Sequence, residues 1–433
     1  MRVGHGSAEL PVPDGTPMGG YIDRPGPSTG LADPLSVSAV TWSDGGSRFA
    51  LAIADVICVN EDLAGRARRA AGCELWLAAS HTHAGPETGC VPGGGPTPEP
   101  WLDRITEAVR TAVRRAIEAE RPCEGMAYRG ELHEVGADRS RPGAPAVVPL
   151  DLIAVRDGGL AGLLVVLPVH PTVLPAANRL VSADLVGAVR ASLRRRLGED
   201  VWVAVATGAA GDISTRHTRR GQDAAELRRL GELVADRCAE LLAGPGTPLW
   251  QAAPTGIASA GATGISGAAS TGIASAGPTG ISGAATTGIS WATRRLTLEP
   301  AATTADEAAL LAGYERAAAS GDPVATRLAR SRLEGLRART APPVPTGVDV
   351  NVARLGGLAL AGLPGEPFLA VAERVADRPG EPTVVLGYVN GYPGYLPTAA
   401  AYRRAEYEVL ASQVAPGSAE LIAETARTLL EEL

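Results

Sequence analysis

The chain has 433 residues, of which 45% are hydrophobic and 20% charged, and its formal net charge is −7. This composition is that of a globular protein long enough to bury a sizeable core. An acidic balance without a basic stripe or interleaved aromatic residues argues against a nucleic-acid partner. All 40 basic residues are arginine, which excludes chemistry through a lysine Schiff base.

The five cysteines are scattered and include no Cys-x-x-Cys pair. That spacing favours neither a disulfide framework nor a cysteine-based zinc site. The N-terminus lacks the apolar stretch of a secretion signal, and no apolar run reaches the ~18 residues of a membrane span. We therefore predict a cytoplasmic protein without a transmembrane segment, while the sequence leaves its oligomeric state open.

In chain order, the hydrophobic pattern predicts strands and helices that alternate along most of the chain, after a Gly- and Pro-rich start. The predicted strands are Phe49–Val56, Leu75–Ala78, Val148–Val155, Leu160–Val169, Val201–Ala206, Trp291–Leu298 and Val384–Tyr388. The predicted helices are Asn60–Ala71, Trp101–Ala119, Asp184–Leu197, Asp223–Leu242, Ala305–Ala319, Val324–Arg339 and Ala419–Leu430. Turns at Asp157-Gly158-Gly159 and Gly356-Gly357 predict two hairpins. The alternation indicates an α/β fold with mixed strand pairing.

A His-x-His pair, His81 and His83, follows one of these strands and precedes a Gly-Pro turn. In an extended segment, residues i and i+2 face the same side, so both imidazoles are expected to point at one spot. Neutral imidazole is a good zinc ligand near neutral pH. The alternative is that both histidines are structural and bond to nearby carbonyls.

Two further polar residues follow apolar strands, as His81 does. His170 lies before Pro171 at the end of one strand, and Glu366 comes just past another. Taken singly, the histidine can be structural, and the carboxylate can cap the next helix. Asp55, Asp184 and Asp212 can either support such a site or serve only in turns and caps.

A Thr-Gly-Ile unit recurs with a period of eight, beginning at Thr255, Thr263, Thr271, Thr279 and Thr287. Each unit offers one large apolar residue, too little burial to offset the cost of ordering its backbone, ~1–2 kcal/mol per residue. We interpret residues 254–290 as a flexible insertion within a single domain that covers residues 1–433. A small solenoid or a partner-binding strand is the alternative.

Several motifs, in this order along the chain, resemble the catalytic domain of the neutral (non-lysosomal) ceramidases. They are Pro17-Met18-Gly19-Gly20-Tyr21, His81-Thr82-His83-Ala84-Gly85-Pro86, Asp138-Arg139-Ser140, His170-Pro171-Thr172 with Asn178, Ser182, Asp184 and Gly187, Gly211-Asp212-Ile213-Ser214, Pro364-Gly365-Glu366, and Asn390-x-Tyr392-x-x-Tyr395 followed by Tyr402 and Tyr407. The resemblance implies a mixed-sheet, ceramidase-like α/β catalytic domain that carries the repeat as a low-complexity insertion.

The same resemblance implies a Zn²⁺ site whose ligands are His81, His170, Glu366 and Tyr395. It makes His83 a histidine beside the metal, and it makes Arg139 and Tyr407 the groups that hold the substrate carbonyl and its oxyanion. Zinc would polarise an amide carbonyl and activate water, and His83 would protonate the leaving amine. Singly, Arg139 can be a solvated charge, and the tyrosines can be packing residues.

The implied function is a zinc-dependent amidohydrolase acting on a small-molecule N-acyl amide. The chain leaves no room for the C-terminal immunoglobulin-like domain of full-length ceramidases, so we expect either a ceramide-like or a smaller N-acyl substrate. One alternative is acyl transfer or cyclisation at the same zinc site in a biosynthetic pathway. A further alternative is a non-catalytic scaffold that binds a partner through the repeat.

Overall fold

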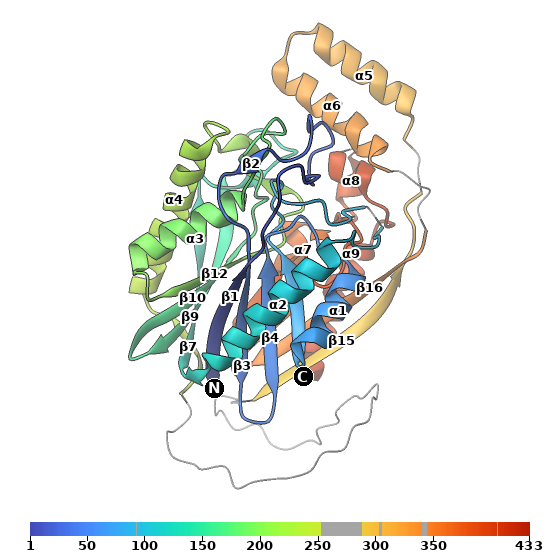
Figure 1. Cartoon of the computed structure of the whole chain (residues 1–433). Coiled ribbons are helices and arrows are strands. Elements are labelled where there is room, and N and C mark those ends of the chain that lie inside the picture. Colours follow the sequence, from blue (N-terminus) through green and yellow to red (C-terminus); the bar gives the residue numbers. More distant parts are fainter. Residues whose placement is uncertain (92, 253–287, 303–304, 340–343, 405) are drawn as a thin grey trace.

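The computed structural model describes residues 1–433 except residues 92, 253–287, 303–304, 340–343 and 405 (Figure 1). In this part of the chain, three sheets of five, five and four strands carry the architecture. No helix of the described residues is long and apolar enough to cross a membrane.

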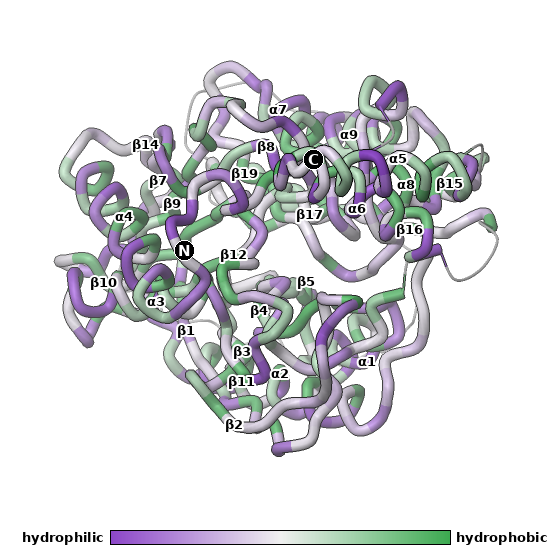
Figure 2. The backbone as a smooth tube through the Cα atoms, turned by 90° about the horizontal axis from the view of Figure 1, so that it is seen from above, coloured by the Kyte–Doolittle hydropathy of each residue, from purple (hydrophilic) through white to green (hydrophobic). Residues whose placement is uncertain are grey.

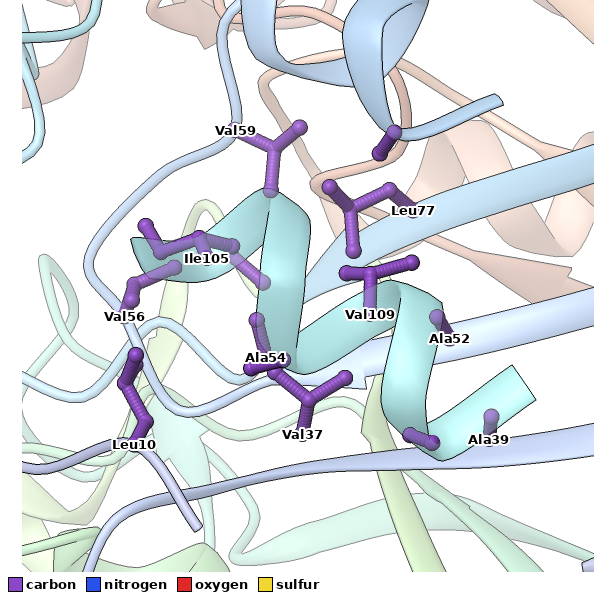
Figure 3. Close-up of a cluster of buried hydrophobic side chains, with 14 of the residues drawn as sticks. Leu10, Val37, Ala39, Ala52, Ala54, Val56, Val59, Leu77, Ile105 and Val109 are labelled. Atoms are coloured by element: carbon purple, nitrogen blue, oxygen red, sulfur yellow. The ribbon is translucent and has the colours of Figure 1, made fainter. Parts of the chain in front are cut away.

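The first sheet has the strand order β5-β4-β3-β1-β6. Its strands are β1 (Arg2–Glu9), β3 (Ser36–Ser43), β4 (Arg48–Ala54), β5 (Glu74–Ala79) and β6 (Arg121–Pro122). Helix α1 (Glu61–Ala71) connects the parallel strands β4 and β5, and helix α2 (Trp101–Glu118) packs beside it. Figure 3 shows Ile105 and Val109 of α2 against Val37 and Ala54 of the sheet.

Strand β1 approaches α2 so closely that it needs glycine at two positions. A Cβ atom on Gly4 would lie 2.0 Å from the backbone oxygen of Ala116, and one on Gly6 would lie 2.3 Å from that of Ala112. These glycines therefore belong to a strand buried under a helix, although glycine is depleted in strands generally.

The second sheet has the order β12-β10-β9-β7-β14. Its strands are β7 (Glu124–His133), β9 (Val147–Asp157), β10 (Gly159–Leu167), β12 (Trp202–Thr207) and β14 (Thr247–Trp250). Helices α3 (Asp184–Leu197) and α4 (Ala224–Ala243) pack together on it. Strand β12 pairs in parallel with β10 after the crossover through α3, as expected for a βαβ connection.

The third sheet has the order β15-β16-β17-β19. Its strands are β15 (Ile289–Leu298), β16 (Thr346–Leu355), β17 (Leu358–Gly362) and β19 (Thr383–Leu386), with α7 (Leu369–Ala376) and α9 (Ser418–Glu432) against it. Trp42, Ile153 and Leu360, one from each large sheet, belong to one buried cluster. The three sheets thus share a core, and Figure 2 shows β12 between the first and third sheets.

Short elements connect the sheets around one end of the molecule. They are the pairs β2 (Gly30–Leu31) with β11 (Leu180–Val181), β8 (Ala137–Asp138) with β13 (Ile213–Ser214) and β18 (Glu366–Pro367) with β20 (Tyr395–Leu396), the 3₁₀ turns Thr215–His217 and Ala401–Arg403, and the helices α5 (Glu307–Ala319), α6 (Pro323–Arg337) and α8 (Tyr407–Ala411). Figure 1 shows α6 above α8 at this end.

The predicted α/β fold with mixed strand pairing is confirmed, and so are both hairpins, β9–β10 and β16–β17. The pattern did not reveal β1, β3 or β7, whose sequences mix glycine or polar residues with apolar ones. Strand β15 begins at Ile289, inside the C-terminal end of the insertion predicted over 254–290. Residues 254–287 of that insertion lie outside the described residues, so its flexibility and the single-domain boundary stay predictions.

Candidate metal site

His81, His170 and Glu366 come together at the ends of three different strands. Their side chains are 1%, 0% and 2% exposed, respectively. His81 follows β5, His170 follows β10 and is bridged to Ser214, and Glu366 lies in β18.

The prediction that the His-x-His segment is extended was wrong, although the side chains of His81 and His83 do converge. Strand β5 ends at Ala79, and His81 has a φ of 64°, so the segment is not extended there. A backbone bond from His81 N to Val56 O (3.0 Å) holds this left-handed conformation. The Nε2 atoms of His81 and His83 still lie 3.3 Å apart.

The backbone fixes how the two ligating imidazoles point. His81 Nδ1 lies 2.6 Å from Ile57 O, and His170 Nδ1 lies 2.6 Å from Ala210 O. A carbonyl oxygen only accepts, so each Nδ1 carries the hydrogen and each Nε2 presents a lone pair when the ring is neutral. Those two Nε2 atoms face each other at 3.1 Å.

Glu366 completes a set of three lone-pair atoms. Its Oε2 lies 3.4 Å from His81 Nε2 and 3.1 Å from His170 Nε2, and it has no hydrogen-bond partner among the described residues. Its Oε1 accepts a hydrogen bond of 2.5 Å from the hydroxyl of Tyr392. His170 Nε2 and Glu366 Oε2 face each other without a donor, which costs free energy unless a cation sits between them.

A metal ion satisfies these three atoms better than a proton does. Burial, followed by the positive charge of Arg139, lowers the pKa of His170 to about 4, so its ring is neutral near pH 7. Two imidazole nitrogens and a carboxylate oxygen suit zinc and other first-row divalent ions. The buried side chains of His81, His83 and His170 also offer nitrogens that all lie within 4.8 Å of one another and can hold a metal ion.

His83 stands beside the other two histidines. Burial, followed by the charges of His81 and His170, lowers its pKa well below the usual value. A Cβ at Gly20, whose φ is 93°, would lie 2.5 Å from the His83 ring, so glycine is required there. The ring of Tyr21 meets the His83 ring edge-on at 5.0 Å between centroids.

Arg139, Tyr395 and Tyr407 form one wall next to this cluster. The Arg139 guanidinium lies 5.3 Å from the ring centroid of Tyr395 and 5.9 Å from that of Tyr407. The Tyr395 ring is nearly parallel to that of His170, at 6.4 Å and 16°. Pairing of β18 with β20 places Tyr395 opposite Glu366. The structure thus brings together every residue that the sequence analysis assigned to the site.

Further residues of the site had no role in the sequence analysis. Glu408 forms an ion pair of 2.5 Å with Arg139, and both side chains are buried. The ring of Tyr388 stacks on that of His81 at 4.3 Å. Glu408 directly follows Tyr407, and this position was the only sequence signal for it. Tyr392, which bonds Glu366, belongs to the Asn-x-Tyr-x-x-Tyr motif, and that position was its only signal.

The three aspartates have structural contacts. Asp184 Oδ1 accepts from Val173 N and Leu185 N, and its Oδ2 accepts from Leu174 N. Asp212 accepts from the backbone of Leu369, the first residue of α7. Both contacts connect loops of the site to helices. Asp55 forms an ion pair with the buried Arg190.

No protein-family model and no curated protein sequence matches this chain. Its structure, however, is similar to solved ceramidase structures over its whole length. It matches the neutral ceramidase from Pseudomonas aeruginosa with a TM-score of 0.73 at 18% identity, covering 100% of this chain and 75% of that one. It matches a ceramidase complexed with C2 with a TM-score of 0.71 at 16% identity, covering 99% and 74%.

These likenesses define the class of fold. The chain has a neutral ceramidase-like fold, as the motifs predicted. Within this fold, His81, His83 and His170 form a buried cluster that can hold a metal ion.

Proposed function

We propose that the protein is a zinc-dependent amidohydrolase that cleaves the amide bond of an N-acyl substrate. One observation carries this proposal, namely the convergence of His81 Nε2, His170 Nε2 and Glu366 Oε2, which belong to three buried side chains. In this proposal Tyr395 is the fourth ligand. Zinc bound there supplies Lewis-acid polarisation and lowers the pKa of water to ~7.

Arg139 and Tyr407 hold the substrate carbonyl oxygen in this proposal. Burial raises the pKa of Tyr407, so its phenol keeps the proton and donates a hydrogen bond. Arg139 keeps its charge because Glu408 pairs with it. Donors aimed at a developing oxyanion contribute about 3–4 kcal/mol each to lowering the barrier.

His83 moves the proton in this proposal. Its ring is neutral near pH 7, because burial lowers its pKa, and its Nε2 lies in the cluster. It accepts a proton from the attacking water as the C–O bond forms, and it passes that proton to the amide nitrogen as the C–N bond breaks. The products are a carboxylic acid and an amine.

The likeness to ceramidases supports an N-acyl amide as substrate, either ceramide-like or smaller. Amine release from a panel running from N-acylsphingosine to short N-acyl amino compounds tests the proposal. We expect release that stops when a chelator is added and returns with zinc. Release that resists the chelator, with zinc removed, contradicts the zinc-dependent mechanism.

Oxygen-labelled water distinguishes hydrolysis from acyl transfer or cyclisation at the same site. Hydrolysis places the label in the carboxylate product, whereas capture by an amine or an internal nucleophile does not. A scaffold without catalysis gives neither product. A cytoplasmic location stays a prediction.

A further inference from the structure

Three arginines lie next to the candidate site and form ion pairs with no described carboxylate. They are Arg216 in the 3₁₀ turn after β13, Arg219 two residues beyond that turn, and Arg327 on α6. We call them the arginine triplet. By contrast, Arg139 pairs with Glu408 and Arg330 pairs with Asp23.

Backbone contacts tie two members of the triplet to the site. Arg216 Nη1 donates to the carbonyl of Arg139 at 3.3 Å. Arg219 Nη1 donates to the carbonyl of Thr172 at 2.6 Å, two residues after His170. Each guanidinium has five N–H donors in a planar fork, so one bond to a neutral carbonyl leaves most of its donors and all of its charge unmatched.

Helix α6, which carries the third arginine, also lies beside the site. It packs on α8, because Gly335 lies so close to Tyr407 that a Cβ would sit 2.6 Å from the Tyr407 carbonyl oxygen. On the other side, Arg330 pairs with Asp23 in the loop after Tyr21. Figure 1 shows α6 directly above α8. Arg327 is exposed on this helix.

The charges of the triplet act on one another. Burial and the positive charges of Arg139, Arg219 and Arg327 together lower the pKa of Arg216 to about 10. Burial, with a contribution from Arg327, also lowers the pKa of Arg219. With a pKa of about 10, Arg216 remains protonated near pH 7, so its charge persists in the folded protein.

The acids that face the triplet are already engaged. Glu408 pairs with Arg139 and accepts from Ser140. Asp184 accepts three backbone N–H groups. Glu226 pairs with Arg229 and accepts from the backbone of Arg220. The triplet therefore keeps a concentrated positive charge at the edge of the site.

Resting on the function proposed above, we propose that the arginine triplet binds an oxyanion of the substrate, a carboxylate or a phosphate, on the part of the molecule outside the scissile amide. The substrate class is then an anionic N-acyl amide rather than a neutral one. Guanidinium forks bind these groups through paired, charge-assisted hydrogen bonds. A neutral amide of the same length leaves the triplet unpaired.

Three substrates of similar length test this inference: N-lauroylglycine, N-lauroylethanolamine and the O-phosphate of the latter. With metal-loaded wild-type protein, we expect kcat/KM for at least one anionic substrate to exceed that for the ethanolamide by about tenfold or more, the range for a hydrogen bond to a charged group. The two anionic arms decide between carboxylate and phosphate. Equal or better cleavage of the neutral amide overturns the inference.

Variants locate the effect. Arg327→Gln removes an exposed charge, and Arg216→Gln keeps a donor for the Arg139 carbonyl. Both should raise KM for the anionic substrate about tenfold and leave the ethanolamide within twofold. Arg332→Gln, at another exposed arginine of α6, is the matched control and should change neither. Equal losses on both substrates would overturn the assignment.

If no substrate is cleaved, the proposed function fails, and calorimetry still tests the anion site. Wild-type protein should then bind N-lauroylglycine more tightly than the ethanolamide, and Arg327→Gln should remove the difference. Equal binding of the two amides, or a difference that survives Arg327→Gln, overturns the inference.

Discussion

Two buried polar clusters in this protein are built in opposite ways. Asp55 and Arg190 form a bidentate ion pair at 2.9 and 2.7 Å, and Ser36 donates to Asp55 from its backbone at 2.9 Å and its hydroxyl at 3.1 Å. In the cluster of His81, His170 and Glu366, the inward-facing atoms are all acceptors.

The difference separates a structural cluster from one that binds something. In the first, every charge is neutralised inside the protein, and the contacts tie β3, β4 and α3 together. In the second, the outer nitrogens are fixed by backbone carbonyls while Glu366 Oε2 is left without a hydrogen-bond donor. Rigidly held polar groups without hydrogen-bond partners do not stabilise the fold. They are expected at functional sites.

The largest expected effect comes from removing a proposed metal ligand from the cluster of His81, His170 and Glu366. His170→Ala should abolish metal binding and lower amide hydrolysis by more than about a thousandfold, since metal polarisation supplies several kcal/mol of transition-state stabilisation. Metal content by atomic emission and amine release measure this. His133→Ala, at a histidine that is 60% exposed, is the control. Unchanged metal content in His170→Ala would falsify the ligand assignment.

Breaking the Asp55–Arg190 ion pair should destabilise the fold and leave metal binding unchanged. Arg190→Met leaves the buried Asp55 carboxylate without its partner, so we expect the free energy of unfolding to fall by about 3–5 kcal/mol. Urea denaturation measures the loss, with Arg195→Met, at an exposed arginine of the same helix, as the control. Metal content per folded molecule should stay at the wild-type level, and its loss would mean that the clusters are coupled.

His5 lies between the two extremes, because it has one hydrogen bond, to Ser38, and stacks on Trp202. Burial, helped by the charge of Arg194, lowers its pKa from 6.5 to about 4. The unfolded chain therefore binds the extra proton first as pH falls from 6.5 to 4. Stability from His5 is fully present above pH 6.5 and is lost towards pH 4, by at most about 3 kcal/mol.

Urea denaturation of wild type and His5→Asn across this pH window isolates the contribution of that histidine. The substituted protein should lose less stability than wild type between pH 6.5 and 4, while His133→Asn should follow wild type. Parallel curves for wild type and His5→Asn would show that His5 is not the group responsible.

The smallest expected effect comes from adding a hydrogen-bond donor to the cluster of His81, His170 and Glu366. Glu366→Gln places an amide N–H where Oε2 faces the Nε2 lone pairs, so the metal-free protein should gain about 1 kcal/mol in the free energy of unfolding. Metal affinity should fall in the same variant because a charged ligand is lost. Thermal unfolding with chelator present measures the gain. A less stable metal-free variant would show that the three acceptors were not repelling one another.

The sequence by itself determined much of the local structure. Trp101, Ile105, Val109 and Val113 at four-residue spacing predicted α2, which the structure has over Trp101–Glu118. The ends of α3 and the β9–β10 hairpin also followed from local patterns. These succeed because side-chain periodicity and turn chemistry act over a few residues. The ceramidase-like fold was predicted from the order of motifs.

Tertiary structure decided what local pattern could not. The close approach of α2 explains why strand β1 has glycine at positions 4 and 6, and His81 is left-handed where its backbone N bonds to Val56 O. The bond between Tyr392 and Glu366 spans 26 residues, and Ser140 reaches Glu408 across 268. Contacts between such distant residues leave no periodic trace in the sequence. The geometry of the site, and the unmatched charge beside it, therefore exist only once the chain has folded.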